Sequence, residues 1–143
     1  MSHPDVVAFD PGLATGWARL NPGHRFESGQ GDWYLVFRTF YETVVMGARP
    51  VIICEDFVYT AETLKKSRQT LSTEGIGVLR FLSRRFDCDF HLQTPAAAKQ
   101  FSTNDKLKRL GWYQPGMGHA NDAARHLLLY SAGAGLVRVS DFL

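Results

Sequence analysis

The sequence is poor in cysteine, has little net charge and contains no long hydrophobic run. Its two cysteines, Cys54 and Cys88, match neither a disulfide framework nor a zinc-ligand spacing, and the apolar run around Cys54 is typical of a buried thiol. No apolar stretch approaches the length of a membrane span, so we expect no membrane partner. The N-terminus lacks a basic segment followed by a long apolar one, so we expect no signal peptide and a reducing, intracellular compartment.

The composition favours a folded domain. Hydrophobic residues make up 45% and aromatic residues 13% of the 143 residues, which is enough for a core and argues against disorder. No linker, repeat or low-complexity tract divides the chain, so we expect one domain over residues 1–143. The formal net charge of +2 is too small to indicate nucleic-acid binding by itself.

Hydrophobic periodicity and turn residues predict three short strands followed by helices and strands in alternation. The predicted strands are residues 6–9, 15–20, 25–31, 51–54 and 88–92, and the predicted helices are 33–46, 70–86, a short one from Pro95, 106–110 and 119–131. In the helix over 70–86, we expect Leu71, Val78, Leu79, Leu82 and Phe86 on the buried face. The order indicates an α/β fold in which helices pack on a mixed sheet.

Three acidic residues stand where apolar elements begin or end. Asp10 ends the first strand, Glu55 ends the strand over 51–54, and Asp122 lies in the first turn of the last predicted helix. If the two strands are neighbours, Asp10 and Glu55 stand side by side, which is unfavourable unless a cation lies between them. Closely spaced hard oxygen ligands suit Mg²⁺ or Mn²⁺. Two such ions commonly stabilise the attacking and leaving oxygens when a phosphodiester is cut.

Three motifs in this order resemble the RuvC family of Holliday-junction resolvases. Residues 10–16, Asp-Pro-Gly-Leu-Ala-Thr-Gly, resemble the opening D-P-G-x-x-x-T-G, and Glu55 in the segment Ile-Cys-Glu-Asp-Phe looks like the second acidic ligand of the family. His119 and Asp122, three residues apart on one helix face, resemble the terminal motif. The resemblance covers nearly the whole chain.

The resemblance implies a ribonuclease-H-like fold, with a three-stranded antiparallel meander and parallel strands in one five-stranded sheet. It also implies a homodimer that cuts Holliday junctions or other branched DNA during recombination and repair, leaving 5′-phosphate and 3′-hydroxyl ends. Two Mg²⁺ ions, with Mn²⁺ able to substitute, would bind Asp10, Glu55, His119 and Asp122, and Lys99 would act at the scissile phosphate. The implied location is the cytoplasm of a bacterial cell, including a phage-infected one.

A second set of residues is expected to contact DNA. The position of the aromatic wedge of the family is Val58 here, so the neighbouring aromatic residues are the candidates. Basic residues that follow the site strand suit contacts with the phosphate backbone. The expected DNA-contacting residues are Phe57, Tyr59, Lys65, Lys66, Arg68, Lys99, Lys106 and Lys108.

Each motif also has an ordinary interpretation. Asp-Pro-Gly is a common turn sequence, a glutamate at a strand end is usually solvated, and Asp122 suits a helix start. His119 could be an ordinary residue of the helix cap, and a supporting role for His126 has only minor weight. The joint occurrence of the acids in the right order favours the metal site.

Two other functions compete with the nuclease. A ribonuclease-H-like module could bind branched nucleic acid as a scaffold without cutting it, although a scaffold has no need of clustered carboxylates. The Asp-Pro-Gly…Thr-Gly turn could also be the phosphate loop of an actin-like ATPase, but 143 residues are too few for the two lobes of that fold. A cleavage assay with and without divalent metal separates the nuclease from the scaffold.

Overall fold

The computed structural model describes residues 3–58 and 70–143. Three antiparallel strands open the fold, namely β1 (Val6–Asp10), β2 (Ala14–Leu20) and β3 (Phe26–Asp32). Strands β4 (Val51–Glu55) and β5 (Phe90–Gln93) extend the sheet in parallel beyond β1. The strand order β3-β2-β1-β4-β5 is the mixed five-stranded sheet that the sequence analysis expected.

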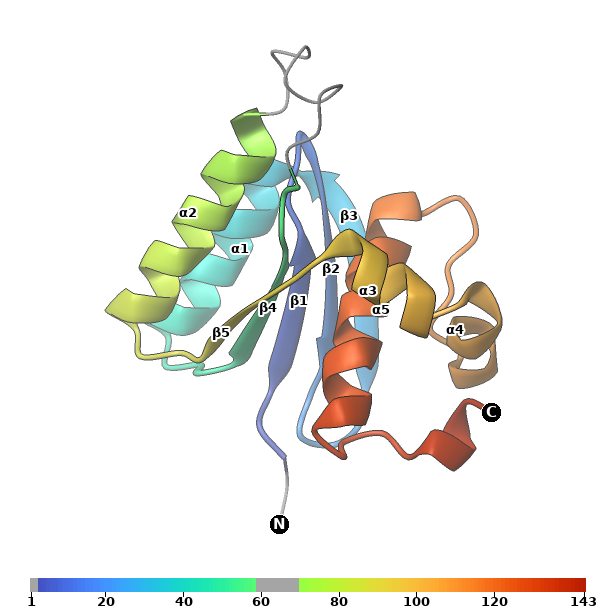
Figure 1. The fold of residues 1–143 in the computed structure, drawn as a ribbon. Helices are drawn as coiled ribbons and strands as arrows, with labels where there is room; N and C mark the ends of the chain where they lie inside the picture. The colour runs from blue at the N-terminus through green and yellow to red at the C-terminus, as the bar shows by residue number, and fades with distance from the viewer. Residues whose placement is uncertain (1–2, 59–69) are drawn as a thin grey trace.

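Helices cover both faces of this sheet (Figure 1). One face packs against α1 (Trp33–Val45) and α2 (Thr70–Arg85), and the other against α5 (Gly118–Gly133). The short helices α3 (Pro95–Phe101) and α4 (Asn104–Leu110) lie on the side of α5, and a 3₁₀ turn, η3 (Val139–Asp141), follows it. Within the described residues, no helix has both the length and the apolar character needed to cross a membrane.

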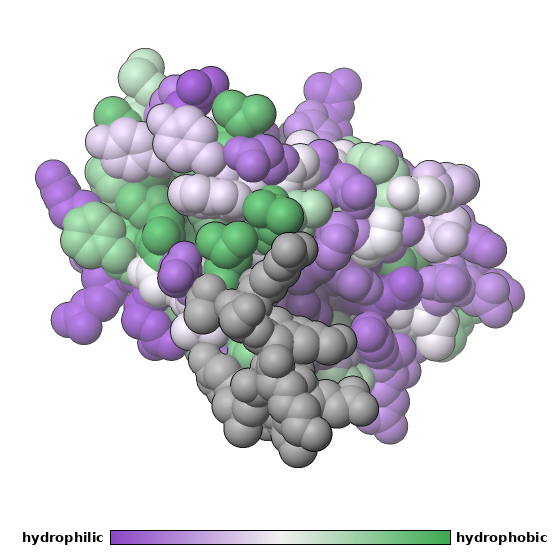
Figure 2. All heavy atoms as spheres, turned by 90° about the horizontal axis from the view of Figure 1, so that it is seen from above, coloured by the Kyte–Doolittle hydropathy of each residue, from purple (hydrophilic) through white to green (hydrophobic). Residues whose placement is uncertain are grey.

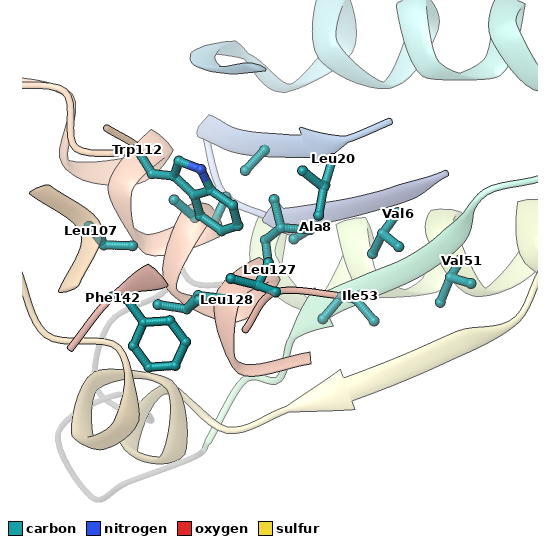
Figure 3. Close-up of a cluster of buried hydrophobic side chains, with 14 residues drawn as sticks. Val6, Ala8, Leu20, Val51, Ile53, Leu107, Trp112, Leu127, Leu128 and Phe142 are labelled. Atoms are coloured by element: carbon teal, nitrogen blue, oxygen red, sulfur yellow. The ribbon is translucent and has the colours of Figure 1, made fainter. Parts of the chain in front are cut away.

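Alternation along the strands assigns each side chain to a face, because successive residues of a strand point to opposite sides. In β1, Val6 and Ala8 join the cluster beneath α5, whereas Val7 and Phe9 join the cluster beneath α1 and α2. Figure 3 shows the α5 cluster, where residues from β1, β2 and β4 meet side chains of α4, α5 and the C-terminal segment. Its largest members are Leu20, Ile53, Leu107, Trp112, Leu127, Leu128 and Phe142.

Helix α2 and strand β5 differ from the sequence prediction. Val78, expected on the buried face of α2, is 40% exposed, because the helix turns Gly75 and Ile76 toward the sheet. A Cβ atom at Gly75 would lie 2.8 Å from the Cβ atom of Pro11, so only glycine allows this approach. The strand expected over 88–92 begins at Phe90, because Asp87 adopts a left-handed backbone (φ 54°) that ends the preceding helical segment.

Candidate active site

The parallel pairing of β1 with β4 places the first two acids side by side. Phe9 lies opposite Cys54 in the register, so the next residues, Asp10 and Glu55, are neighbours across the two strands. Asp10 continues the series Val6 and Ala8 along β1, and Glu55 continues the series Val51 and Ile53 along β4. Both carboxylates therefore point to the face of the sheet that α5 covers.

Helix α5 brings the other two predicted ligands to the same place. His119 lies in its first turn, with Nδ1 3.1 Å from Oδ2 of Asp10. Asp122 lies one turn later, and Oδ1 accepts a hydrogen bond from Nε of Arg125 at 3.4 Å. All five residues predicted to be catalytic line one cavity of about 580 Å³. These residues are Asp10, Glu55, Lys99, His119 and Asp122.

The cavity does not favour ionisation of all its carboxyl groups in the absence of a cation. Asp10 is only 7% exposed. Burial, together with the hydrogen bond to Glu55 and the charges of Glu55 and Asp122, raises the pKa of Asp10 to about 10. Burial would raise the pKa of Glu55 as well, but hydrogen bonds from His126 and Asp10 and the charge of Lys99 lower it. In the absence of a cation, Asp10 therefore carries the proton that the two carboxyl groups share.

The turn after β1 is held by Thr15, the threonine of the first motif. Its buried Oγ1 donates to the carbonyl of Gly12 at 2.8 Å and accepts from the Gly12 N–H at 3.4 Å. These bonds close the loop that lies directly after Asp10. The turn interpretation of Asp-Pro-Gly and the site interpretation therefore describe the same residues, because the turn forms part of the cavity wall.

The N-terminus of α5 is anchored by the sheet rather than by its own cap. No side chain of the preceding residue caps the helix. Instead, Oε1 of Gln30 in β3 accepts the N–H groups of His119 at 3.0 Å and Ala120 at 3.2 Å. These groups have no partner within a helix. Gln30 thus holds the helical turn that carries His119 in place over the sheet.

Replacing Gln30 with leucine should destabilise the protein by about 1 kcal/mol, the usual cost of losing a helix cap. Cleavage should fall as well, because the turn that carries His119 loses its anchor. Urea unfolding of the Gln30→Leu variant measures the first effect. Gln100→Leu on the exposed part of α3 is the control, with stability close to that of the wild type. Equal stability of the two variants would contradict the anchoring role.

The expected DNA-contacting residues divide into three groups. Phe57 and Lys99 line the cavity, together with Val58 at the wedge position. Lys106 and Lys108 lie on α4, where Lys106 Nζ donates to the carbonyl of Phe101 at 2.8 Å and Lys108 packs over the ring of Tyr113. Neither of these two lysines lines the cavity. The remaining residues, Tyr59, Lys65, Lys66 and Arg68, lie outside the described residues.

The donor set fits a hard divalent cation. Four carboxyl groups, those of Asp10, Glu55, Asp56 and Asp122, and the imidazole of His119 line the cavity, and oxygen-rich donor sets suit hard divalent cations. Among residues 3–58 and 70–143, no three His, Cys, Asp or Glu side chains stand in a ready-made metal geometry. Asp10, Glu55 and Asp122 line the cavity while hydrogen-bonded to His119, His126 and Arg125 respectively.

Comparison with known proteins identifies the fold. The chain is similar to the solved structure of Thermus thermophilus RuvC in complex with Holliday junction substrate, with a TM-score of 0.67 and 14% identity over 94% of this chain and 96% of that one. The chain has the RuvC fold. A second RuvC structure from Thermus thermophilus gives a TM-score of 0.58 and 13% identity, covering 92% of this chain and 96% of that one. No protein-family model matches the chain, and no curated protein matches it.

The RuvC likeness confirms the ribonuclease-H-like fold that the three motifs implied. Several residues that support the cavity could not be predicted from the sequence, because their contacts link distant segments. Gln30 lies 89 residues before His119, and nothing in the sequence around it marks a helix cap. Arg125 binds Asp122, the Ser102 carbonyl and Asn104, and only its spacing of three from Asp122 was visible in the sequence.

Proposed function

We propose that this protein is a divalent-metal-dependent endonuclease that cuts Holliday junctions or related branched DNA. The fold is shared with RuvC, of which one solved structure contains a Holliday junction substrate. The cavity supplies the acids and the lysine that such a reaction needs. The fold and the meeting of the motif residues in one cavity both support this proposal.

One observation carries the proposal. The parallel register of β1 and β4 places Asp10 beside Glu55, and α5 adds His119 and Asp122 to the same cavity. Placing a buried carboxyl group next to a second, partly buried one costs stability, and such a cost is typical of a functional site. Clusters of this kind, with a strongly shifted pKa in a cleft, are typical of catalytic sites.

The cavity residues have distinct parts in the proposed hydrolysis. Asp10, Glu55, Asp122 and His119 would hold two divalent ions, Mg²⁺ or Mn²⁺, which supply the activated water and the charge neutralisation at phosphorus. Lys99, exposed on the cavity wall, would bind a non-bridging oxygen of the scissile phosphate.

The chemistry is an in-line displacement at phosphorus. The water gives up a proton to solvent as its oxygen forms a bond to phosphorus, the bond from phosphorus to O3′ breaks, and O3′ takes up a proton. The products have 5′-phosphate and 3′-hydroxyl ends.

A panel of labelled DNAs tests the substrate. It holds a mobile four-way junction, a three-way junction, a flap, linear duplex and single strand, each with Mg²⁺. Paired nicks confined to the four-way junction, sealed afterwards by DNA ligase, would support a resolvase. Cutting of several branched forms would support a broader debranching nuclease, whereas cutting of linear duplex at the same rate would contradict structure-specific cleavage.

We further propose that the protein acts as a homodimer, because paired nicks on a symmetric junction need two sites. Large apolar side chains are exposed mainly on α1 and α2, and Figure 2 shows hydrophobic side chains gathered on that side of the molecule. A second copy would cover them, since exposed apolar patches mark association surfaces. The exposed apolar residues are Tyr34, Leu35, Tyr41 and Val45 on α1, Met46 directly after it, and Val78 and Phe81 on α2.

Replacing Phe81 with glutamate should weaken the dimer at least tenfold, because a charge would be buried in an apolar interface. Phe81 is 66% exposed in the single chain, so the fold should tolerate the change. Sedimentation equilibrium measures the dissociation constant. Val139→Glu, at an exposed apolar residue on η3, is the matched control and should leave the dimer unchanged. An unchanged dimer in Phe81→Glu would place the interface elsewhere.

A further inference from the structure

A chain of buried polar side chains lies behind Glu55. His126, on α5, is 1% exposed, and its two ring nitrogens face oxygen atoms from two different strands. Nε2 lies 3.0 Å from Oε1 of Glu55, and Nδ1 lies 2.9 Å from Oε1 of Gln93. Gln93 is the residue opposite Glu55 in the pairing of β4 with β5, so the three side chains come from three adjacent elements.

The placement of His126 follows from the same periodicity that places Asp122. The two residues are four apart on α5, so they lie on the same side of the helix, one turn from each other. Asp122 reaches the cavity, whereas His126 lies deeper, against the sheet. An imidazole at this depth is costly unless both nitrogens are hydrogen-bonded. Here an oxygen of Glu55 and an oxygen of Gln93 lie within hydrogen-bonding distance of the two nitrogens, which fixes the orientation of the ring.

The hydrogen bond restricts Glu55 in turn. A glutamate at the end of a strand has several side-chain conformations, and a ligand for a cation must adopt one of them. His126 contacts Oε1 of Glu55, and Glu55 still lines the cavity. Arrangements in which a buried group orients a ligating side chain are common behind metal ligands, and losing such a partner costs about 10–100-fold in metal affinity or activity.

We propose that His126, supported by Gln93, is a positioning residue that holds the Glu55 carboxylate in the orientation needed to bind a divalent cation. This inference rests on the proposed function, because it assigns Glu55 a metal. Substitution by leucine distinguishes this positioning role from a packing role. Leucine has a similar volume, so a packing residue would tolerate that substitution without any change in metal affinity.

The test compares three variants by calorimetric titration with Mn²⁺ alone, together with thermal unfolding in EDTA. His126→Leu should fold but bind Mn²⁺ about tenfold more weakly, since it removes the donor to Glu55. His126→Gln, whose amide N–H can reach Oε1, should recover most of the affinity. Gln93→Leu, on the edge strand β5, should give an intermediate loss.

The nicking rate of a four-way junction should follow the same order. At saturating Mn²⁺, His126→Leu should regain much of its rate while the DNA concentration for half-maximal binding stays unchanged. Wild-type Mn²⁺ affinity in His126→Leu would overturn the proposal. If His126→Leu does not fold, wild-type affinity in Gln93→Leu would overturn it instead. Failure of the wild-type protein to bind Mn²⁺ or to cut any DNA would instead refute the proposed function.

Discussion

The Asp10→Asn variant should lose DNA cleavage by about a thousandfold or more and still bind a four-way junction with wild-type affinity. Asn keeps the shape of the side chain but cannot ionise, so it removes the anionic oxygen that Asp10 would offer to a cation beside Glu55 and His119. Loss of a metal-ligating charge costs several kcal/mol in the transition state, and about 4 kcal/mol corresponds to a factor of about a thousand. Binding depends on surface contacts with phosphates, so it should persist.

Single-turnover nicking and a gel-shift titration measure these two effects. Asp105→Asn makes the same chemical change on α4, outside the cavity, and should cut at the wild-type rate. Wild-type cleavage by Asp10→Asn would show that the cavity is not the catalytic site. Loss of junction binding in the same variant would instead assign Asp10 to DNA recognition.

The same substitution should stabilise the metal-free protein at neutral pH. The pKa of Asp10 is about 10 in the fold against an ordinary value of 3.8, so the folded state binds this proton more tightly than the unfolded chain. The contribution of Asp10 to stability is therefore greatest below about pH 4 and is lost as the pH rises toward 10. Asn does not ionise, so the Asp10→Asn variant does not lose this stability as the pH rises. Its melting temperature in EDTA should therefore exceed that of the wild type at pH 8.

Replacing Gly16 with alanine should strongly destabilise the protein. A Cβ atom there would lie 1.9 Å from the carbonyl oxygen of His119 and 2.3 Å from its carbonyl carbon. These are backbone atoms of the first turn of α5, so the helix itself has to move. Overpacking of this kind costs about 3 kcal/mol, and the displaced His119 and Asp122 should reduce cleavage at least a hundredfold.

Urea unfolding and single-turnover cleavage check both effects. Gly77→Ala is the control, because a Cβ atom at Gly77 meets no other atom within 4 Å. Alanine in the middle of α2 should stabilise that variant by about 0.5–1 kcal/mol, with cleavage unchanged. Equal stability of the Gly16→Ala and wild-type proteins would contradict the tight contact between β2 and α5.

The sequence predicted the parts of the site that depend on local pattern. Asp10 and Glu55 each end an apolar strand, and the spacing of His119 and Asp122 places them on one helix face, so their approach needed only the correct strand order. Gln30 could not be found in this way. Its contact with α5 depends on how far the third strand extends beside the second, which no short motif encodes.

Lys106 shows a second limit of prediction from sequence, because tertiary contacts of a basic side chain are not visible there. A basic residue after the third helix suggested a phosphate contact, but its Nζ bonds the carbonyl of Phe101 and lies over the rings of Phe101 and Phe142. This contact brings together α3, α4 and the C-terminal segment, so it depends on tertiary packing of side chains that periodicity does not reveal. A role for Lys106 in DNA binding stays a prediction.

Single-turnover nicking of an end-labelled four-way junction in Mg²⁺ and in EDTA tests the central claim most directly, namely that the cavity of Asp10, Glu55, His119 and Asp122 is a metal-dependent nuclease site. We expect paired nicks in Mg²⁺, none in EDTA, and none with Asp10→Asn in either buffer. Tight junction binding in EDTA, without nicks under any divalent condition, would contradict the claim and favour a scaffold that binds branched DNA without cutting it.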